Sequence, residues 1–345
     1  MNIYCKNRSV RHCGAGRFLI VFSVLLLAGC RPQAPTHLAG KAQGTYYSIL
    51  YRDPQGRNLQ TQVDSLLNDF DQMASLWVDT SLLRRVNANL TTDITPRFAA
   101  LLDHSDSIRR YTGGAFDVRI GRLVQAWGFS FRQREELAQS TLDSLLRAAR
   151  CEVAVEGLQI KKQCPGTELD FNAIAQGYSS DLVAAFFDSL GIENYLIDIG
   201  GEVVARGDKG RGQPWRVGIE KPAEDRYSDP IVQTAIALSD KAVVTSGSYR
   251  KYYEKDGVRY SHTIDPATGR PVTHSLLSVS VVERDCWLAD AMATAYMVMG
   301  LERAKQFIAD HPDGPGTEAV MFIYDDGGTL ATYATSGFEK LEENK

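Results

Sequence analysis

Residues 261–271 read Ser261-His262-Thr263-Ile264-Asp265-Pro266-Ala267-Thr268-Gly269-Arg270-Pro271. His262 and Asp265 place an imidazole and a carboxylate three residues apart, and Pro266 with Gly269 predicts a tight turn directly after them. One interpretation makes the histidine a hydrogen-bonded residue that holds this turn through Asp265. The other makes it a general base, because an unperturbed imidazole titrates near neutrality.

Residues 289–295 read Ala289-Asp290-Ala291-Met292-Ala293-Thr294-Ala295 and begin a predicted helix that runs to Met299. Asp290 and Thr294 are spaced i, i+4, so both side-chain oxygens lie on one face of that helix, as a hard cation such as Mg²⁺ requires. An Asp before an apolar helix is also a common N-cap. The spacing alone leaves both interpretations open.

Composition favours an exported, folded enzyme. The chain has 345 residues, 44% of them hydrophobic, which is enough for the core of one large domain or two modest ones. The formal net charge is −4, with acidic and basic residues interspersed, so nothing indicates a nucleic-acid partner.

The N-terminus carries a targeting signal. Basic residues from Lys6 to Arg17 precede an apolar run, Phe18–Ala28, which is too short for a comfortable membrane span, and the run ends Leu27-Ala28-Gly29-Cys30. This pattern predicts a bacterial lipoprotein of the cell envelope, anchored by lipid on Cys30 and facing the periplasm. The alternative is a plain secretory signal that happens to end in Cys. The predicted segments are a signal peptide over 1–29, a tether over 30–40 and a domain over 41–345.

Three of the six cysteines remain after Cys5, Cys13 and Cys30 are assigned to the signal and the anchor. The segment between Cys151 and Cys164 alternates apolar and polar residues on both sides of Gly157, which predicts a β-hairpin with the two cysteines side by side. We therefore predict a disulfide between them, with two free thiols as the alternative. Cys286 has no evident partner and is expected to be a packed or semi-exposed thiol.

Periodicity predicts an α+β fold with mixed or antiparallel sheets and packed helices. Helical spacing occurs over Thr61–Leu76, Phe98–Tyr111, Ser140–Ala149, Gln176–Leu190 and Ala289–Met299. Strand patterns occur over Gln43–Tyr51, Tyr195–Ile199, Trp215–Ile219, Ile231–Leu238, Lys241–Thr245, Leu277–Val282 and Ala319–Tyr324.

Several further segments combine glycines with oxygen ligands: Thr112–Asp117, Leu169–Asp181, Ile197–Glu202 and Thr245–Tyr249. Each has an ordinary structural interpretation, as a helix C-cap, a strand end or a tight turn. Each also suits a phosphate or flat-ring ligand approached by the backbone. The chain lacks the sequence patterns of a nucleophile elbow, a P-loop, a Rossmann fingerprint and an H-E-x-x-H zinc site.

The order of these segments resembles the ApbE family of FAD:protein FMN transferases over nearly all of the chain after the signal. The matching elements are Gly44-Thr45; Trp77 with Ser81 to Asn87; Gly113 to Asp117; Trp127-Gly128-Phe129; Asp170 to Tyr178; Ile199 to Gly201; Ser246 to Tyr249; His262 to Pro271; and Ala289 to Ala295.

The resemblance implies site residues. The flavin-binding positions of the family fall on Gln43, Trp77, Ala115, Phe116, Asp117, Asp170, Gln176 and Ile264. The metal positions fall on the Ala173 carbonyl, Asp290 and Thr294. Trp77 is expected to stack on the flavin, with a core tryptophan as the alternative. The chain departs from some relatives by Ala293 in place of Asp, and from many by Gln176 in place of Lys or Glu.

The resemblance also implies an Mg²⁺-dependent transfer of FMN from FAD to a Thr or Ser hydroxyl, with AMP released and His262 as the candidate base. Acceptors of this family are subunits of membrane electron-transfer complexes. Two alternatives remain at this level: a flavin-binding lipoprotein without transferase activity, and a pyrophosphatase that splits FAD to FMN and AMP.

Overall fold

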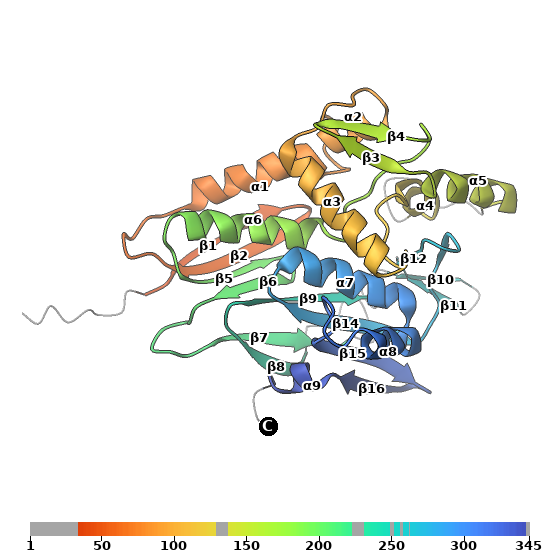
Figure 1. Ribbon diagram of the computed structural model, residues 1–345. Coiled ribbons are helices and arrows are strands. Elements are labelled where there is room, and N and C mark those ends of the chain that lie inside the picture. The colour runs from red at the N-terminus through yellow and green to blue at the C-terminus, as the bar shows by residue number, and fades with distance from the viewer. Residues whose placement is uncertain are drawn as a thin grey trace, which may run out of the picture. The chain divides into compact units, whose positions relative to one another are not determined.

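Figure 1 shows the computed structural model, which describes residues 34–128, 137–222, 231–248, 252–255, 258–261 and 263–342, with only the backbone for 252–255 and 258–261. An antiparallel sheet of eight strands runs through it in the order β1-β2-β5-β6-β9-β14-β15-β16. The predicted α+β class with antiparallel sheets is confirmed. The strands are β1 (Thr36–Ala42), β2 (Thr45–Arg52), β5 (Asn194–Ile199), β6 (Glu202–Arg206), β9 (Lys241–Gly247), β14 (Leu276–Glu283), β15 (Ala319–Asp326) and β16 (Thr329–Ala334).

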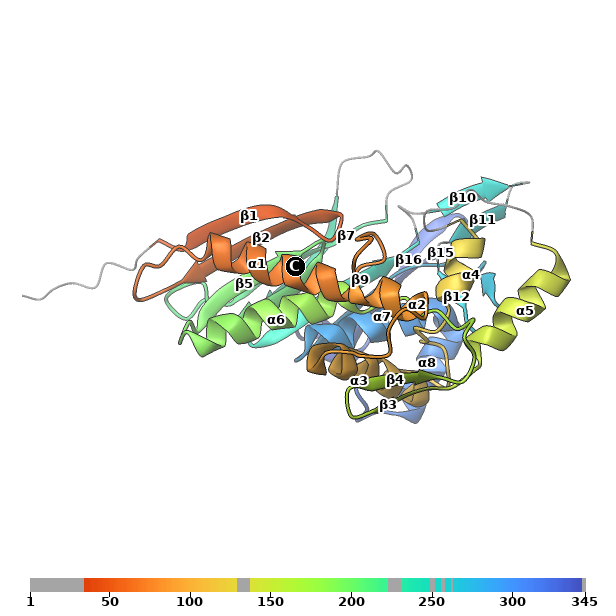
Figure 2. The same ribbon diagram turned by 90° about the horizontal axis from the view of Figure 1, so that it is seen from above.

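Helices cover one face of this sheet (Figures 1 and 2). Helix α1 packs on β1, α6 on β5 and β6, and α7 on β9 and β14, while α3 packs on α7. Their bounds are α1 (Gln60–Ala74), α3 (Pro96–Tyr111), α6 (Ala175–Ser189) and α7 (Cys286–Met299). These four predicted helices and α5 (Gln139–Ala149) are confirmed, with ends that differ from the predicted ones by at most three residues.

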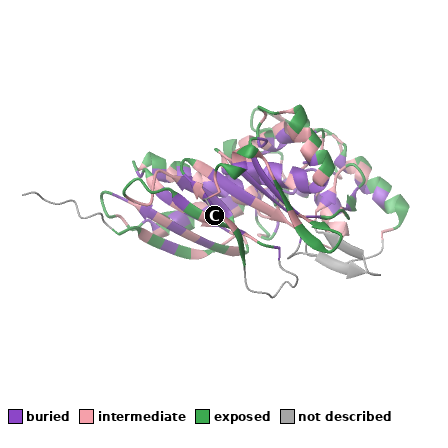
Figure 3. Cartoon of the chain, turned by 90° about the horizontal axis from the view of Figure 1, so that it is seen from below, coloured by how far each residue is buried: buried purple, intermediate pink, exposed green. Residues whose placement is uncertain are grey.

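The opposite face is covered by the hairpin of β7 (Trp215–Glu220) and β8 (Val232–Leu238) and by α9 (Ser336–Glu339). Strand side chains alternate between the two faces, so neighbours on one strand enter different cores. On β14, Val281 packs under the helices and Val282 packs toward the β7–β8 hairpin. Figure 3, which views the chain from below, shows this alternation as a change of burial class along the strands.

The predicted tether is wrong from Thr36 onward, because Thr36–Ala42 is strand β1 at the edge of the sheet. The predicted strand from Gln43 is also shorter, since Gln43 and Gly44 form a two-residue turn with φ values of 53° and 73°. A turn with positive φ at both positions matches the twist of a hairpin. The polar and small residues of β1 carry little strand propensity, so its pairing with β2 decides its structure.

Smaller elements pack around these layers (Figure 1): α2 (Leu82–Asn87), α4 (Gly121–Ala126), α8 (Leu301–Asp310), and the strand pairs β3 (Val153–Glu156) with β4 (Gln159–Lys162), β10 (Tyr252–Lys255) with β11 (Val258–Ser261), and β12 (Ile264–Asp265) with β13 (Arg270–Pro271). The pairing of β3 with β4 confirms the predicted hairpin. No helix in the described part of the chain is both long and apolar enough to cross a membrane.

Candidate functional site

The N-terminal turns of α6 and α7 cross closely, which brings the predicted cation residues to the start of α6. Oδ2 of Asp290 accepts a hydrogen bond from the backbone amide of Gly177 at 3.0 Å. Gly177 permits this approach, since a Cβ atom there would lie 2.5 Å from the carbonyl oxygen of Cys286. Burial raises the pKa of Asp290, and the nearby charge of Asp181 raises it further.

Helix α7 begins at Cys286, so Asp290 lies one turn inside it and the interpretation of Asp290 as the N-cap of its own helix is wrong. Its carboxylate instead bonds a first-turn amide of α6. Thr294, one turn further along α7, places Oγ1 3.4 Å from Oγ of Ser246 on β9. The crossing therefore brings together one carboxylate and two hydroxyls from two elements, α7 and β9, beside the first-turn amide of α6.

The carbonyl of Ala173 lies just before α6. In a regular helix the Gly177 amide would bond this carbonyl, but here it donates to Asp290, which leaves the Ala173 oxygen outside the hydrogen-bond ladder of α6. Among the residues described, no three His, Cys, Asp or Glu side chains gather as a metal site. The predicted cation set consists of one carboxylate, one hydroxyl and one carbonyl.

A cleft of about 600 Å³ opens at the β1–β2 turn. Its lining residues are Lys41, Ala42, Gln43, Gly44, Thr45, Tyr46 and Asp71. Both polar atoms of the Gln43 side-chain amide are buried and have no hydrogen-bond partner among the residues that the structure describes. An orphaned buried amide is costly in a folded protein and marks a position where a ligand can supply the partner. Burial raises the pKa of Asp71, and the backbone amide of Gln43 partly opposes this shift.

Gln176 connects this cleft to the helix crossing. A Cβ atom on Gly200 would lie 2.4 Å from Nε2 of Gln176 and 2.7 Å from Cγ2 of Thr45. Gly200 and Gly201 both have positive φ, at 69° and 110°, which glycine adopts without strain, and a side chain at Gly200 would clash with these neighbours. The predicted Ile199–Gly201 strand end, Gln176 and the cleft therefore meet.

Asp117 forms a close ion pair with Arg119. Oδ2 of Asp117 lies 2.7 Å from Nη2 of Arg119, and Oδ1 also accepts from the Arg119 backbone amide at 2.9 Å. Both side chains are less than a tenth exposed. The carboxylate predicted to contact flavin is thus held in place by an arginine that the sequence reasoning did not assign.

Asp170 is buried directly beside this loop. Its backbone amide donates to the carbonyl of Val118 at 2.7 Å, and Oδ1 accepts from the Asn172 amide at 2.8 Å. Burial raises the pKa of Asp170 to about 6, although the Asn172 hydrogen bond lowers it. The structure therefore brings Asp117 and Asp170 onto adjacent loops that are paired through their backbones.

The remaining predicted flavin positions differ in exposure. Trp77 is 60% exposed, so the core-tryptophan alternative is wrong. Ala115, Phe116 and Ile264 are buried, at 7%, 2% and 3% exposure. Any flavin contact from these three positions therefore falls mainly to the backbone.

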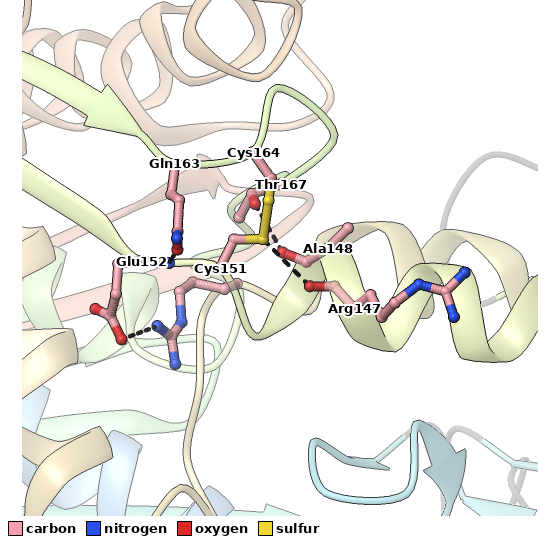
Figure 4. The surroundings of a disulfide bond; sticks show 8 residues. Arg147, Ala148, Cys151, Glu152, Gln163, Cys164 and Thr167 are labelled. Atoms are coloured by element: carbon pink, nitrogen blue, oxygen red, sulfur yellow. Dashed lines mark hydrogen bonds and ion pairs between the residues drawn. A yellow bond between two sulfur atoms is a disulfide. The ribbon is translucent and has the colours of Figure 1, made fainter.

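The structure joins Cys151 and Cys164 by a disulfide, with Cα atoms 5.8 Å apart (Figure 4). Oγ1 of Thr167 donates to the carbonyl of Ala148 at 2.7 Å, which adds a second link between the same segments. The bond connects the end of α5 to the segment that leads into Asp170. Cys286, expected to be a packed or semi-exposed thiol, is a fully buried free thiol.

Some predictions lie outside the described residues: the signal peptide, Cys30, Phe129, Tyr249 and His262. Sequence reasoning also missed Asp71, Arg119 and Asp181. Asp181 ends the quoted Leu169–Asp181 segment and Arg119 follows Asp117 by two residues, so the motifs carried a signal for both. Asp71 lies on an ordinary amphipathic helix and carried none.

Comparisons with known proteins show the family of the chain. Residues 43–321 match the ApbE family. A FAD:protein FMN transferase of Vibrio cholerae is 38% identical, covering 92% of this chain and 96% of that protein, and one of Escherichia coli K12 is 33% identical, covering 94% and 97%. The solved flavin transferase ApbE of Vibrio cholerae superposes with a TM-score of 0.78 at 33% identity, over 89% of this chain and 99% of that one. The apo flavinyl transferase ApbE of Pseudomonas stutzeri gives 0.79 at 30%, over 89% and 96%.

The fold and the site define an α+β protein in which a cleft at a sheet-edge turn adjoins the N-terminal ends of two crossing helices. The chain belongs to the ApbE family.

Proposed function

We propose that this chain is a FAD:protein FMN transferase, which moves FMN from FAD to a Thr or Ser hydroxyl of an acceptor protein and releases AMP. Relatives that carry this name match it over nearly their whole length. The observation that carries the proposal is the meeting of three distant segments: the Gln43 turn, the start of α6 and the Asp290 face of α7.

The residues present fit FAD. The orphaned amide of Gln43 offers a donor and an acceptor at the cleft, and the exposed ring of Trp77 offers a stacking surface. The glycine pair at Gly200 and Gly201 allows the backbone to approach a flat or phosphorylated ligand. These groups come from the cleft, the loop after α1 and the end of β5.

The residues also fit a magnesium ion. Asp290, Thr294 and the Ala173 carbonyl would hold it, and all three are oxygen ligands of the kind that Mg²⁺ prefers. When bound, the ion would neutralise negative charge on the pyrophosphate of FAD. The site carries one carboxylate, with Ala293 beside it, so we expect the ion to be held less tightly than at a two-carboxylate site.

In the proposed reaction the acceptor hydroxyl oxygen attacks the FMN-side phosphorus, the bond to AMP breaks, and the hydroxyl proton passes to a base. His262 is the candidate base. Trp77 and the Gln43 turn would hold FAD, and Arg119 would keep the Asp117 loop in place through their ion pair.

The test is to incubate the chain with FAD, Mg²⁺ and a candidate acceptor and to weigh the acceptor. The proposal expects a mass increase equal to one phosphoester-linked FMN, with AMP in solution. FMN and AMP released without an acceptor adduct would instead indicate a pyrophosphatase. Bound FAD that stays intact would indicate a simple flavin carrier.

An Asp290→Asn variant isolates the carboxylate charge, because the amide oxygen of Asn can still accept from Gly177. Transfer should fall by orders of magnitude while the melting temperature changes little. Asp290→Ala should lose both transfer and about 1 kcal/mol of stability, since the α6 amide loses its acceptor. Full activity of the Asn variant would remove Asp290 from the cation site.

We further propose that the chain is a lipoprotein anchored through Cys30 in the bacterial cell envelope, where it faces the periplasm. The basic and apolar residues before Cys30 support this assignment. The proposed acceptors are subunits of membrane electron-transfer complexes. Cys30→Ser should move the protein from the membrane fraction to soluble or uncleaved forms; a processed protein that stays on the membrane would contradict the anchor.

A further inference from the structure

Helices α6 and α7 cap each other. Asp181 lies in the second turn of α6, yet its two carboxylate oxygens accept from the first two amides of α7: Oδ1 from Cys286 at 3.0 Å and Oδ2 from Trp287 at 2.8 Å. Asp290 of α7 accepts in return from Gly177 in the first turn of α6. Each helix therefore supplies the carboxylate that an N-cap residue normally supplies.

Neither helix has a capping side chain at its own start. The side chain of Ile174, which precedes α6, is apolar and cannot accept a hydrogen bond. Asp285 precedes α7, but its side chain makes no capping hydrogen bond. The first turn of α7 thus depends on Asp181, 105 residues away in sequence from Cys286. Without that contact, the orphan amides of α7 lose the partner that ties them to α6.

The two helices also pack in close contact at Gly177. A Cβ atom on Gly177 would lie 2.8 Å from Cβ of Asp290 and 2.9 Å from the backbone carbonyl carbon of Cys286. The Ala173 carbonyl stands at the start of α6, while Asp290 and Thr294 stand on α7. The relative placement of the two helices therefore fixes how the three predicted cation ligands face one another.

We propose that Asp181 is a positioning residue for the cation site, which holds the first turn of α7 against α6 and so fixes Asp290 and Thr294 relative to Ala173. This inference rests on the proposed function, because these groups are cation ligands only if the site binds Mg²⁺. Asp181 itself need not touch the ion or the substrate, since its two oxygens are occupied by the α7 amides.

The test compares Asp181→Asn with Asp285→Asn. Both variants replace a carboxyl group near the start of α7 with an amide, but only Asp181 makes the capping bonds. The half-saturating concentration of Mg²⁺ is read from the rise in melting temperature with FAD present and no acceptor. Asp181→Asn should raise this half-saturating concentration by about 10- to 100-fold, the usual effect of losing a group that orients a metal ligand. Asp285→Asn should leave it unchanged.

Hydrogen exchange supplies a second readout: Asn keeps only one acceptor oxygen, so at least one of the amides of Cys286 and Trp287 should lose protection in Asp181→Asn alone. If the wild-type chain shows no response to Mg²⁺, the cation site and this inference fail together. If the wild type responds and Asp181→Asn responds equally, only the inference fails. Should Asp181→Asn not fold, Asp181→Ser removes both carboxylate oxygens and leaves one hydroxyl, and an unchanged Mg²⁺ response in that variant would equally overturn the proposal.

Discussion

The indole Nε1 of Trp127 donates a 2.7 Å hydrogen bond to the carbonyl of Gly269, 142 residues away. Gly269 closes the predicted turn after His262, and a Cβ atom there would lie 2.9 Å from a side-chain carbon of Leu142 on α5. Two motifs that are separate in the sequence are thus joined in the structure. Helices α4 and α5 hold the turn from one side, through this bond and through the packing of Ile264.

We predict that Trp127→Phe lowers FMN transfer by up to about 100-fold, because a small displacement of a positioned group can cost that much. Trp215→Phe is the matched control, since Trp215 makes the same kind of bond, from Nε1 to the Arg206 carbonyl at 2.8 Å, on the far face of the sheet. Each variant should lose about 1 kcal/mol of stability from the hydrogen bond. Equal loss of transfer in both would show that stability, not the turn, is what Trp127 supports.

The local patterns of the chain predicted most of the helices and strands. Val63, Leu67 and Phe70 recur at helical spacing and are all buried on one side of α1. Period-2 strands such as Tyr195–Ile199 were equally clear, since Tyr195 and Ile197 are fully buried. These elements follow from hydrophobic periodicity, which each segment carries in itself.

What the patterns could not predict depends on partners far along the chain. Strand β1 exists because it pairs with β2, and its own residues do not favour a strand. Helix α7 begins at Cys286 and not at the predicted Ala289, because Asp181 caps its first turn from another helix. The roles of Asp71 and Asp181 likewise arise only from tertiary contacts, so no local spacing reveals them.

The unpaired amide of Gln43 leads us to predict that a substitution at this position stabilises the folded chain when no ligand is bound. Gln43→Met keeps the length of the side chain but removes two buried polar atoms that have no partner in the described part of the chain. The free energy of unfolding without ligand should therefore rise, by no more than about 3 kcal/mol. FAD affinity should fall, because the ligand loses a donor and an acceptor at the cleft.

Gln60→Met is the control for this prediction. The Gln60 amide already donates to Asp64, at 3.1 Å, and to the hydroxyl of Tyr47. The same substitution should therefore lower stability there and leave FAD affinity unchanged. Thermal melts and flavin fluorescence titrations measure both quantities, and an unchanged FAD affinity in Gln43→Met would exclude the side chain from flavin binding.

The raised pKa of Asp170 predicts that the free energy of unfolding depends on pH. Burial raises its pKa from 3.8 to about 6, so the folded chain keeps a proton that the unfolded chain has lost between these values. The stabilising contribution of the neutral carboxyl is complete below about pH 4 and is lost as the pH rises through 6, up to about 3 kcal/mol in all. The free energy of unfolding of the wild type, measured relative to that of Asp170→Asn, should fall as the pH rises from about 4 through 6 and should then remain constant.

Asp53 provides a control, because the pKa of its carboxyl is lowered and its contribution to stability should therefore change with pH in the opposite direction. Its side chain is fully buried against Arg57, whose hydrogen bonds lower the pKa of Asp53 to about 2. Its contribution should be present above about pH 4 and be lost as the pH falls toward 2. Chemical denaturation of Asp170→Asn, Asp53→Asn and the wild type across pH 2 to 7 tests both. The same slope for both variants would contradict the assigned burial effects.

His262 directly precedes a turn whose hydrogen bonds the structure describes. The carboxylate of Asp265 accepts from the Ala267 amide at 2.9 Å and from Oγ1 of Thr268 at 3.1 Å. The turn is therefore closed by its own residues. We predict that His262→Ala lowers FMN transfer by roughly 100- to 10,000-fold with little change in FAD affinity, as expected for loss of a general base.

Thr268→Ala is the matched variant, because it weakens the turn without touching the imidazole. The wild-type rate should rise with pH through the imidazole range, near pH 6.5 for an unperturbed histidine. That limb should vanish in His262→Ala and persist in Thr268→Ala, which also separates it from the titration of Asp170 in the same range. If His262→Ala instead weakens FAD binding and stability as Thr268→Ala does, and keeps the pH limb, the imidazole holds the turn and catalysis must come from the cation site and from positioning.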